Sequence, residues 1–170
     1  MSPADFHIYI VSDGSCSSVD RSGGWATVIA TSTRQVLLLG AELNTTISRC
    51  EIMPILAGLR WVRGTIQGYR GLRIRLVSDS EFVIHTLSGH FERKDGLLME
   101  LWAAYDQLAD GLLIRPMWTS RNVHPYQQLV DAAASRARRS LLNARTGMAE
   151  EPAFDLKAED MSLFNTEEFP

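Results

Sequence analysis

The most constraining feature of this sequence is the order of its regular elements: three strand patterns come first, and helices then alternate with strands. Alternating apolar residues predict strands over residues 6–12, 25–30 and 36–43, with short turns that favour an antiparallel meander. Apolar residues at helical spacing follow from Ser48 to about Thr65. A chain with this order is predicted to form one mixed sheet with helices packed against it.

The rest of the chain continues the alternation. Strand patterns cover residues 72–78 and 112–118, and helical patterns begin at Ser80, cover residues 97–108 and extend from residue 125 to about 144. The predicted order is βββαβααβα. We therefore expect an α/β fold with a five-stranded mixed sheet and helices on both faces.

An acidic tail follows the last helical pattern. Residues 148–170 contain seven acidic residues and one basic residue, so this segment carries −6; because the whole chain carries −3, residues 1–147 carry +3. We expect residues 1–147 to form one folded domain and residues 148–170 to be a flexible segment. The slightly basic domain permits phosphate binding.

The sequence contains no sign of a membrane or secreted protein. No apolar stretch reaches the length of a membrane span, and the first residues lack a secretory signal pattern. Cys16 and Cys50 have neither metal-site spacing nor a disulfide framework, so we expect a buried free thiol at each position. These features predict a cytoplasmic protein that does not contact a membrane.

Four acidic residues lie where their carboxylates could converge. Asp13 and Asp79 close the first and fourth strand patterns, Glu51 lies at the start of the first helix, and Asp131 lies in the last helix. Converging carboxylates repel one another unless they bind a cation, and carboxylate oxygens are ligands of Mg²⁺. A Mg²⁺ site that acts on phosphate groups is the natural interpretation.

Simpler roles stay open for each of these acids. Glu51 could instead only complete a capping box with Ser48 at the start of its helix, and Asp79 could cap the helix that follows it. Asp13 and Gly14 could form a turn, and Asp131 could be an exposed helical acid.

The motifs around the four acids resemble ribonuclease H of type 1. The matching segments are Ser-Asp-Gly-Ser-Cys at residues 12–16, Gly-Gly at 23–24, Thr-Thr-Ile-Ser-Arg-Cys-Glu at 45–51, Val-Ser-Asp-Ser at 77–80, and His-Pro at 124–125 followed by Asp131. The resemblance covers about residues 6–143. It implies the ribonuclease H-like fold, a catalytic domain over residues 1–147, and an endonuclease that hydrolyses the RNA strand of RNA–DNA hybrids.

The resemblance also implies a cofactor and a substrate surface. Two Mg²⁺ ions, for which Mn²⁺ can substitute, would be held by Asp13, Glu51, Asp79 and Asp131, with Asp13 between the ions. The products would carry 5′-phosphate and 3′-hydroxyl ends. The residues expected to contact the substrate lie next to the acids: Gly14, Ser15, Cys16, Thr46, Ser48, Arg49 and Ser80.

The sequence departs from the family pattern at a second catalytic position. Arg121 occupies the offset at which the family usually has a mobile histidine, so Arg121 and His124 are both candidates for that role. Arg121 could face the scissile phosphate as a cation, but it cannot act as a general acid at neutral pH. His124 could instead cap or pack against the last helix.

Two further departures concern the substrate. Ile47 and Ser48 replace paired asparagines that help to recognise the hybrid, and Ile47 could instead be a hydrophobic staple at the helix start. The basic protrusion of many bacterial members is absent, and only Arg93 and Lys94 occupy the short connection. We expect weak and salt-sensitive hybrid binding, which leaves open a nuclease of this fold that acts on other structured RNA or DNA.

The tail contains a second motif. Residues 160–164 resemble the peptide by which bacterial replication and repair proteins dock on the sliding clamp, with matches at Met161, Leu163 and Phe164. An exposed Leu-Phe pair favours a hydrophobic pocket on a partner. We therefore expect a sliding clamp as a partner beside the hybrid. The tail could instead fold back on the domain or bind nothing, or the chain could be a clamp-tethered interaction module with weak activity.

Overall fold

The fold is built on a five-stranded sheet in the order β3-β2-β1-β4-β5. The computed structural model describes residues 6–94, 96–121 and 123–146. Strand β1 pairs antiparallel with β2 and parallel with β4, so the predicted mixed sheet is confirmed. The strands are β1 (Ile8–Cys16), β2 (Gly23–Thr31), β3 (Gln35–Glu42), β4 (Arg73–Ser78) and β5 (Leu113–Trp118).

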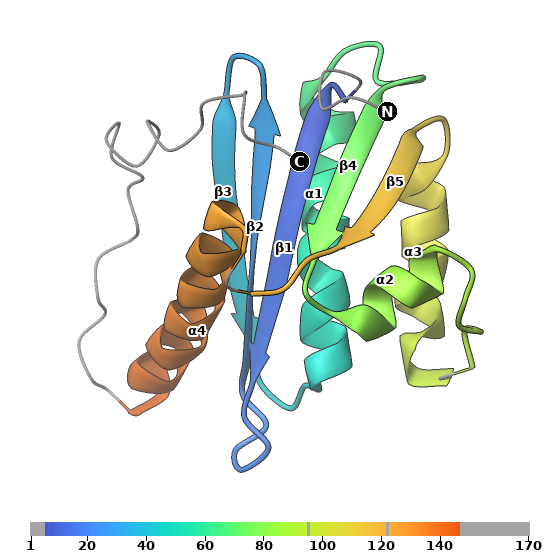
Figure 1. Ribbon diagram of the computed structural model, residues 1–170. Coiled ribbons are helices and arrows are strands. Elements are labelled where there is room, and N and C mark those ends of the chain that lie inside the picture. Colours follow the sequence, from blue (N-terminus) through green and yellow to red (C-terminus); the bar gives the residue numbers. More distant parts are fainter. Residues whose placement is uncertain (1–5, 95, 122, 147–170) are drawn as a thin grey trace.

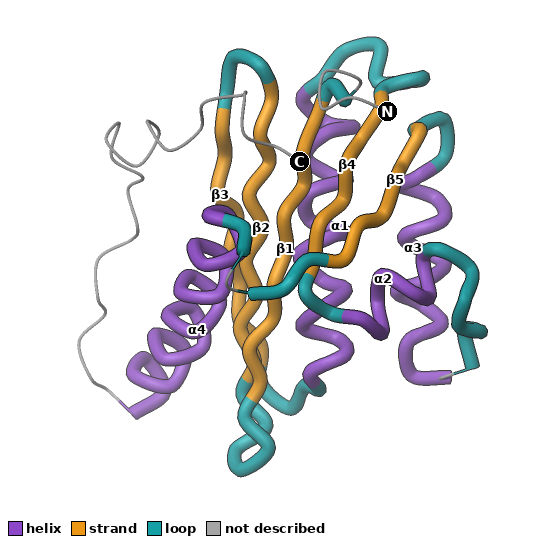
Figure 2. Tube along the Cα trace, viewed as in Figure 1, coloured by secondary structure: helices purple, strands orange, loops and turns teal. Residues whose placement is uncertain are grey.

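Helices cover both faces of this sheet, as predicted from the element order (Figures 1 and 2). They are α1 (Ile47–Thr65), α2 (Glu81–Leu87), α3 (Met99–Ala109) and α4 (Pro125–Thr146), and a 3-10 turn at Gly96–Leu98 precedes α3. Helices α1, α2 and α3 contribute to one buried core, and α4 forms a second core on the opposite face. No helix in the described ranges is long and apolar enough to cross a membrane.

Helix α1 forms the centre of the larger core. Its side chains Ile52, Ile55, Leu56 and Leu59 are each 0% exposed, because their helical spacing places them on one face against the sheet. The helix continues through Pro54, which lies inside it. Proline lacks an N–H group, so it cannot donate a hydrogen bond to the carbonyl oxygen four residues earlier.

The start of α1 corrects two expectations. Thr46, not Ser48, is the N-cap residue, and its side chain accepts a hydrogen bond from the backbone N–H of Arg49. The capping box predicted for Ser48 and Glu51 is therefore wrong, because the helix begins at Ile47. Ile47 is 50% exposed, so it does not form the expected hydrophobic staple.

Candidate active site

Parallel pairing of β1 with β4 brings Asp13 and Asp79 to one edge of the sheet. The pairing ends at Ser12 and Ser78, which lie opposite each other, so each aspartate follows the last paired residue of its strand. Strand β1 itself continues to Cys16 by pairing with β2, and Asp13 lies opposite Ala26. Asp13 is thus inside a strand, and the alternative of a turn at this residue is wrong.

A close backbone contact places Glu51 beside Asp13. A Cβ atom on Gly14 would lie 2.6 Å from the carbonyl carbon of Cys50 and 2.8 Å from the nitrogen of Glu51, so only glycine permits this approach of β1 to α1. Because Pro54 has no N–H group, the Cys50 carbonyl oxygen does not accept the usual helical hydrogen bond from the residue four positions later. The first turns of α1 can therefore lie directly against β1.

The three carboxylates form a compact cluster. Each of Asp13, Glu51 and Asp79 offers one carboxylate oxygen, and these oxygens lie within 4.8 Å of one another. Asp13 is 0% exposed and Glu51 is 8% exposed. Burial, followed by the charge of Asp79, raises the pKa of Asp13 to about 8. Burial, followed by the charges of Asp13 and Asp79, raises the pKa of Glu51 to about 9.

This cluster suits a hard divalent cation. Asp13 Oδ2 and Glu51 Oε2 are buried, and neither has a hydrogen-bond partner among the described residues. Buried carboxylate oxygens without a donor are destabilising unless something else compensates their charge. An all-oxygen donor set is the kind that Mg²⁺ and Mn²⁺ prefer, so the residues present fit the predicted metal.

Arg121 connects Asp131 to the cluster. Its Nε atom donates a hydrogen bond of 3.0 Å to Asp79 Oδ2, and its Nη1 atom lies 3.5 Å from Asp131 Oδ1. The negative charge of Asp131 also contributes to the raised pKa of Asp13. The structure thus brings all four predicted acids to one region, with three in direct proximity and Asp131 linked through an arginine.

Two residues that sequence reasoning missed hold this region in place. Gln127 is 0% exposed, and its Nε2 atom donates a hydrogen bond of 3.3 Å to the backbone oxygen of Ser12. Because it lies one turn before Asp131 on α4, it fixes the helix beside Asp13. Trp118 Nε1 donates to the backbone oxygen of Asp79 over 3.0 Å. The four-residue spacing of Gln127 and Asp131 was the available signal.

The predicted substrate residues surround the acids in different ways. Thr46 is exposed at the start of α1, and Ser48 beside it is half-buried. Arg49 forms an ion pair of 2.9 Å with Glu42, so its charge is partly compensated. Ser80 caps α2 by accepting from the N–H of Val83, which excludes Asp79 as the cap.

The strand residues after Asp13 complete this set. Gly14 contacts the backbone of α1, and the Ser15 hydroxyl accepts a hydrogen bond of 3.4 Å from that of Ser135 on α4. Cys16 lies beyond them and is partly exposed. Both cysteines carry free thiols, as expected, but only Cys50 is buried, so the expected burial of Cys16 is wrong.

His124 is buried just before α4 and packs against Tyr126. It is 7% exposed, its ring stacks on Tyr126 with centroids 5.7 Å apart, and burial lowers its pKa. This placement supports the packing role, and it leaves Arg121 as the residue that contacts two of the carboxylates. Met161, Leu163 and Phe164, the predicted partner-binding residues, lie outside the described residues.

The sequence is similar to those of bacterial ribonucleases H. The family model for RNase H matches residues 5–118. Ribonuclease H of Campylobacter jejuni is 30% identical over 138 residues, which cover 77% of this chain and 90% of the relative. Ribonuclease H of Cupriavidus pinatubonensis is 28% identical over 146 residues, which cover 79% of this chain and 97% of the relative.

Solved structures show the same fold. The N-terminal RNase H domain of a Mycobacterium tuberculosis protein has a TM-score of 0.70 at 20% identity and covers 81% of this chain and 97% of that domain's chain. LC11-RNase H1, solved in complex with an RNA/DNA hybrid, has a TM-score of 0.67 at 16% identity and covers 79% of this chain and 99% of its own. With the matching family model and the named relatives, the chain belongs to the ribonuclease H family and is a hydrolytic nuclease of that type.

Proposed function

We propose that this protein is a metal-dependent endonuclease that hydrolyses the RNA strand of RNA–DNA hybrids and leaves 5′-phosphate and 3′-hydroxyl ends. The observation that carries the proposal is the cluster of Asp13, Glu51 and Asp79, whose carboxylate oxygens lie within 4.8 Å of one another. Asp13 and Glu51 are buried and have raised pKa values, so a bound divalent cation would stabilise their ionised carboxylates. The hybrid bound to LC11-RNase H1 supports the substrate class.

The cofactor in this proposal is two Mg²⁺ ions, with Mn²⁺ as a substitute. Asp13 would ligate both, Glu51 and Asp79 would complete one set of ligands, and Asp131 would complete the other. Bound Mg²⁺ would neutralise charge on the phosphate and lower the pKa of the attacking water. The residues of the chain position the ligands: β1 and β4 fix two carboxylates, and Gln127 fixes the helix that carries Asp131.

Arg121 contributes a positive charge at the same place. Its side chain is 53% exposed and reaches Asp79 and Asp131. When the acids ligate metal, the guanidinium group can turn to a phosphate oxygen, because arginine binds both carboxylates and phosphates through the same N–H groups. Arg121 remains charged at neutral pH, so it positions phosphate and does not transfer a proton.

This protein should bind its substrate weakly for a member of the family. Arg93 Nη1 lies 2.7 Å from Asp106, and Lys94 lies 2.6 Å from Glu92, so both cations of the short connection are compensated by acids. Neither is available for a phosphate without breaking an ion pair. Few cations of this connection are left to contact phosphates, so hybrid binding should be weak, and added salt should weaken it further.

Substrate choice is the finer part of the proposal. Ile47 is exposed at the start of α1, and its side chain offers no hydrogen bond to a 2′-hydroxyl group. This observation favours, as a second candidate, a nuclease of the same fold with broader choice among structured RNA and DNA. The same assay separates the two candidates.

The decisive experiment compares cleavage of an RNA–DNA hybrid, double-stranded RNA and single-stranded DNA with Mg²⁺ or Mn²⁺. We expect cleavage of the hybrid alone in the wild type, loss of cleavage in Asp79→Asn, and normal cleavage in Asp110→Asn. Asp110 is an exposed acid paired with Arg70 and is a matched control. Equal cleavage of all three substrates would favour the second candidate, and full activity of Asp79→Asn would refute the metal site.

The boundary of the catalytic domain near residue 147, a cytoplasmic location and a sliding-clamp partner for residues 160–164 belong to the same proposal. The sequence of the tail supports the last of these, since Met161, Leu163 and Phe164 match the docking motif. A fluorescence polarisation assay with a peptide of residues 155–170 tests it, and a peptide with Leu163→Ala and Phe164→Ala is the control.

A further inference from the structure

One face of the sheet is only partly covered by helices. Helix α4 packs across β1, β2 and β3, and its core reaches β4 and β5 only near their C-terminal ends, at Val77 and Met117. Within the described part of the chain, no helix lies over the N-terminal halves of β4 and β5 on this face (Figure 1). Side chains that point to this side of the two strands are therefore open to a partner.

Three arginines occupy this uncovered area. Side chains alternate along a strand, so Arg73 and Arg75 of β4 lie on the same side as Val77, and Arg115 of β5 lies on the same side as Met117. Arg75 and Arg115 lie directly opposite each other. We call Arg73, Arg75 and Arg115 the arginine face.

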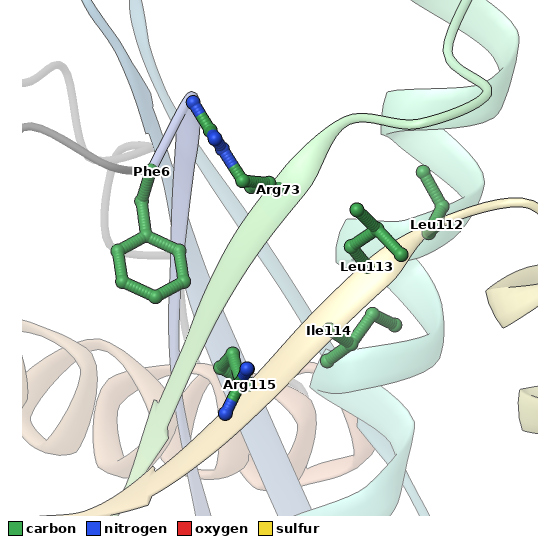
Figure 3. Close-up of a pocket in the computed structure, with 6 residues that line it drawn as sticks. All are labelled: Phe6, Arg73, Leu112, Leu113, Ile114 and Arg115. Carbon is green, nitrogen blue, oxygen red and sulfur yellow. The ribbon is translucent and has the colours of Figure 1, made fainter. Parts of the chain in front are cut away.

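Apolar groups lie between these charges. Phe6, Leu113 and Ile114 line a pocket of about 300 Å³ together with Arg73 and Arg115 (Figure 3). The Arg75 guanidinium carbon lies 4.1 Å from the centre of the Phe6 ring. Leu113 is 58% exposed, so an apolar side chain of a partner could cover it.

The charge of the arginine face is not compensated within the described residues. No carboxylate there lies within ion-pair distance of Arg73, Arg75 or Arg115. Arg73 Nε is buried and lacks a hydrogen-bond partner in the same residues. A partner for this face should therefore combine several negative charges with apolar side chains.

The last residues of this chain have that composition. Residues 159–170 contain four acidic residues and no basic residue, and between and after the acids lie Leu163, Phe164 and Phe169. A covalently attached segment is present at an effective concentration of about a millimolar, so weak contacts are sufficient to hold it.

The length of the chain allows this segment, and not the nearer acids, to reach the arginine face. Helix α4 continues 15 residues beyond Asp131, or about 22 Å. Arg75 pairs with Tyr9, which lies four residues before Asp13 on β1, or about 13 Å in the other direction. The distance to cover is therefore about 35 Å. An extended chain reaches about 43 Å from Thr146 to Glu159 but only about 30 Å to Asp155.

We propose that residues 159–170 dock on the arginine face, with acidic side chains on Arg73, Arg75 and Arg115 and an apolar side chain in the pocket beside Phe6. This segment contains the motif proposed for the clamp, so docking and clamp binding would exclude each other. The docking itself does not rest on the proposed nuclease activity.

Limited proteolysis of the full chain tests this contact. A protease specific for glutamate should cut wild-type protein slowly after Glu167 and Glu168 and rapidly after Glu150, which is too near α4 to dock. In Arg75→Gln with Arg115→Gln, or in 0.5 M salt, we expect cleavage after Glu167 and Glu168 to become about threefold to tenfold faster, because about 1 kcal/mol of ion pairing is lost. Cleavage after Glu150 should not change.

Three controls make the result specific. Arg75→Lys with Arg115→Lys keeps the charge and should retain protection, and Arg60→Gln with Arg139→Gln removes two exposed charges elsewhere and should not alter it. Melting temperatures identify any variant that is partly unfolded. Equal cleavage rates in wild type, the double glutamine variant and high salt would overturn the proposal. If that variant instead only loses affinity for hybrid, the arginine face contacts nucleic acid and the proposal is also overturned.

Discussion

Replacing Asp13 by asparagine should stabilise the metal-free protein, although it removes a residue of the proposed metal site. Two ionised carboxylates 4.8 Å apart repel by about 3.5 kcal/mol at an effective dielectric constant of about 20. Asp79 is the ionised neighbour that contributes most to this repulsion, and Arg121 offsets part of it. We expect the free energy of unfolding to rise by about 3 kcal/mol at pH 8, or about 6–12 °C in melting temperature for a chain of this size.

The sign of the pH dependence follows from the raised pKa. In the unfolded chain Asp13 titrates near pH 4, and in the folded protein its pKa is about 8. The folded state therefore holds a proton that the unfolded state loses, and stability falls as the pH rises from about 4 to about 8. The asparagine of the variant cannot titrate, so the difference between variant and wild type should be largest above pH 8 and should vanish near pH 4.

Thermal unfolding followed by circular dichroism in a metal chelator measures this difference, with Asp110→Asn as the control for an exposed aspartate. Adding Mg²⁺ at ten times its dissociation constant should stabilise the wild type by about 1.4 kcal/mol and should have a much smaller effect on the variant. An Asp13→Asn protein that melts at or below the wild-type temperature at pH 8 in chelator would refute the electrostatic reasoning.

Three other substitutions test neighbouring parts of the structure. Gly14→Ala should destabilise the protein by about 3 kcal/mol in urea unfolding, because its Cβ would lie 2.6 Å from the Cys50 carbonyl carbon; an unchanged midpoint would contradict this contact. Arg121→Ala should tighten Mg²⁺ binding by calorimetry about threefold to tenfold, since a competing cation is removed; weaker binding would mean that the arginine does not compete. Leu56→Ala should cost about 2–5 kcal/mol of stability, because the side chain is 0% exposed; a loss below about 1 kcal/mol would mean that the core collapses around the gap.

Most of the fold could be predicted from apolar periodicity. The element order and the main strands and helices follow from local patterns, because burial of one face imposes the spacing of apolar residues. The end of β1 could not be found in this way. Asp13 to Cys16 are polar or small, and they remain in the strand only because β2 pairs with them as far as Gly23.

The parts of the site that could be predicted were those in which the residue type and its position indicate one kind of chemistry. Carboxylates after apolar strands indicated a metal site, and three of them converge. The ion pairs of Arg121 and the buried amide of Gln127 depend on which elements become neighbours in space, which local sequence does not state. The cap at Thr46 was missed because Ser48 with Glu51 formed an equally good local pattern.

The pairing of β1 with β4 makes the distance between Asp13 and Asp79 a property of strand length. Backbone hydrogen bonds set that distance, so side chains along both strands can change widely while the two carboxylates stay together. Deletion of a single residue within β4 would have a larger effect. If the upstream pairing stayed fixed, Asp79 would move back along the strand by about 3.3 Å, and its carboxylate would point to the opposite face of the sheet. The site should therefore tolerate substitutions in these strands far better than insertions or deletions.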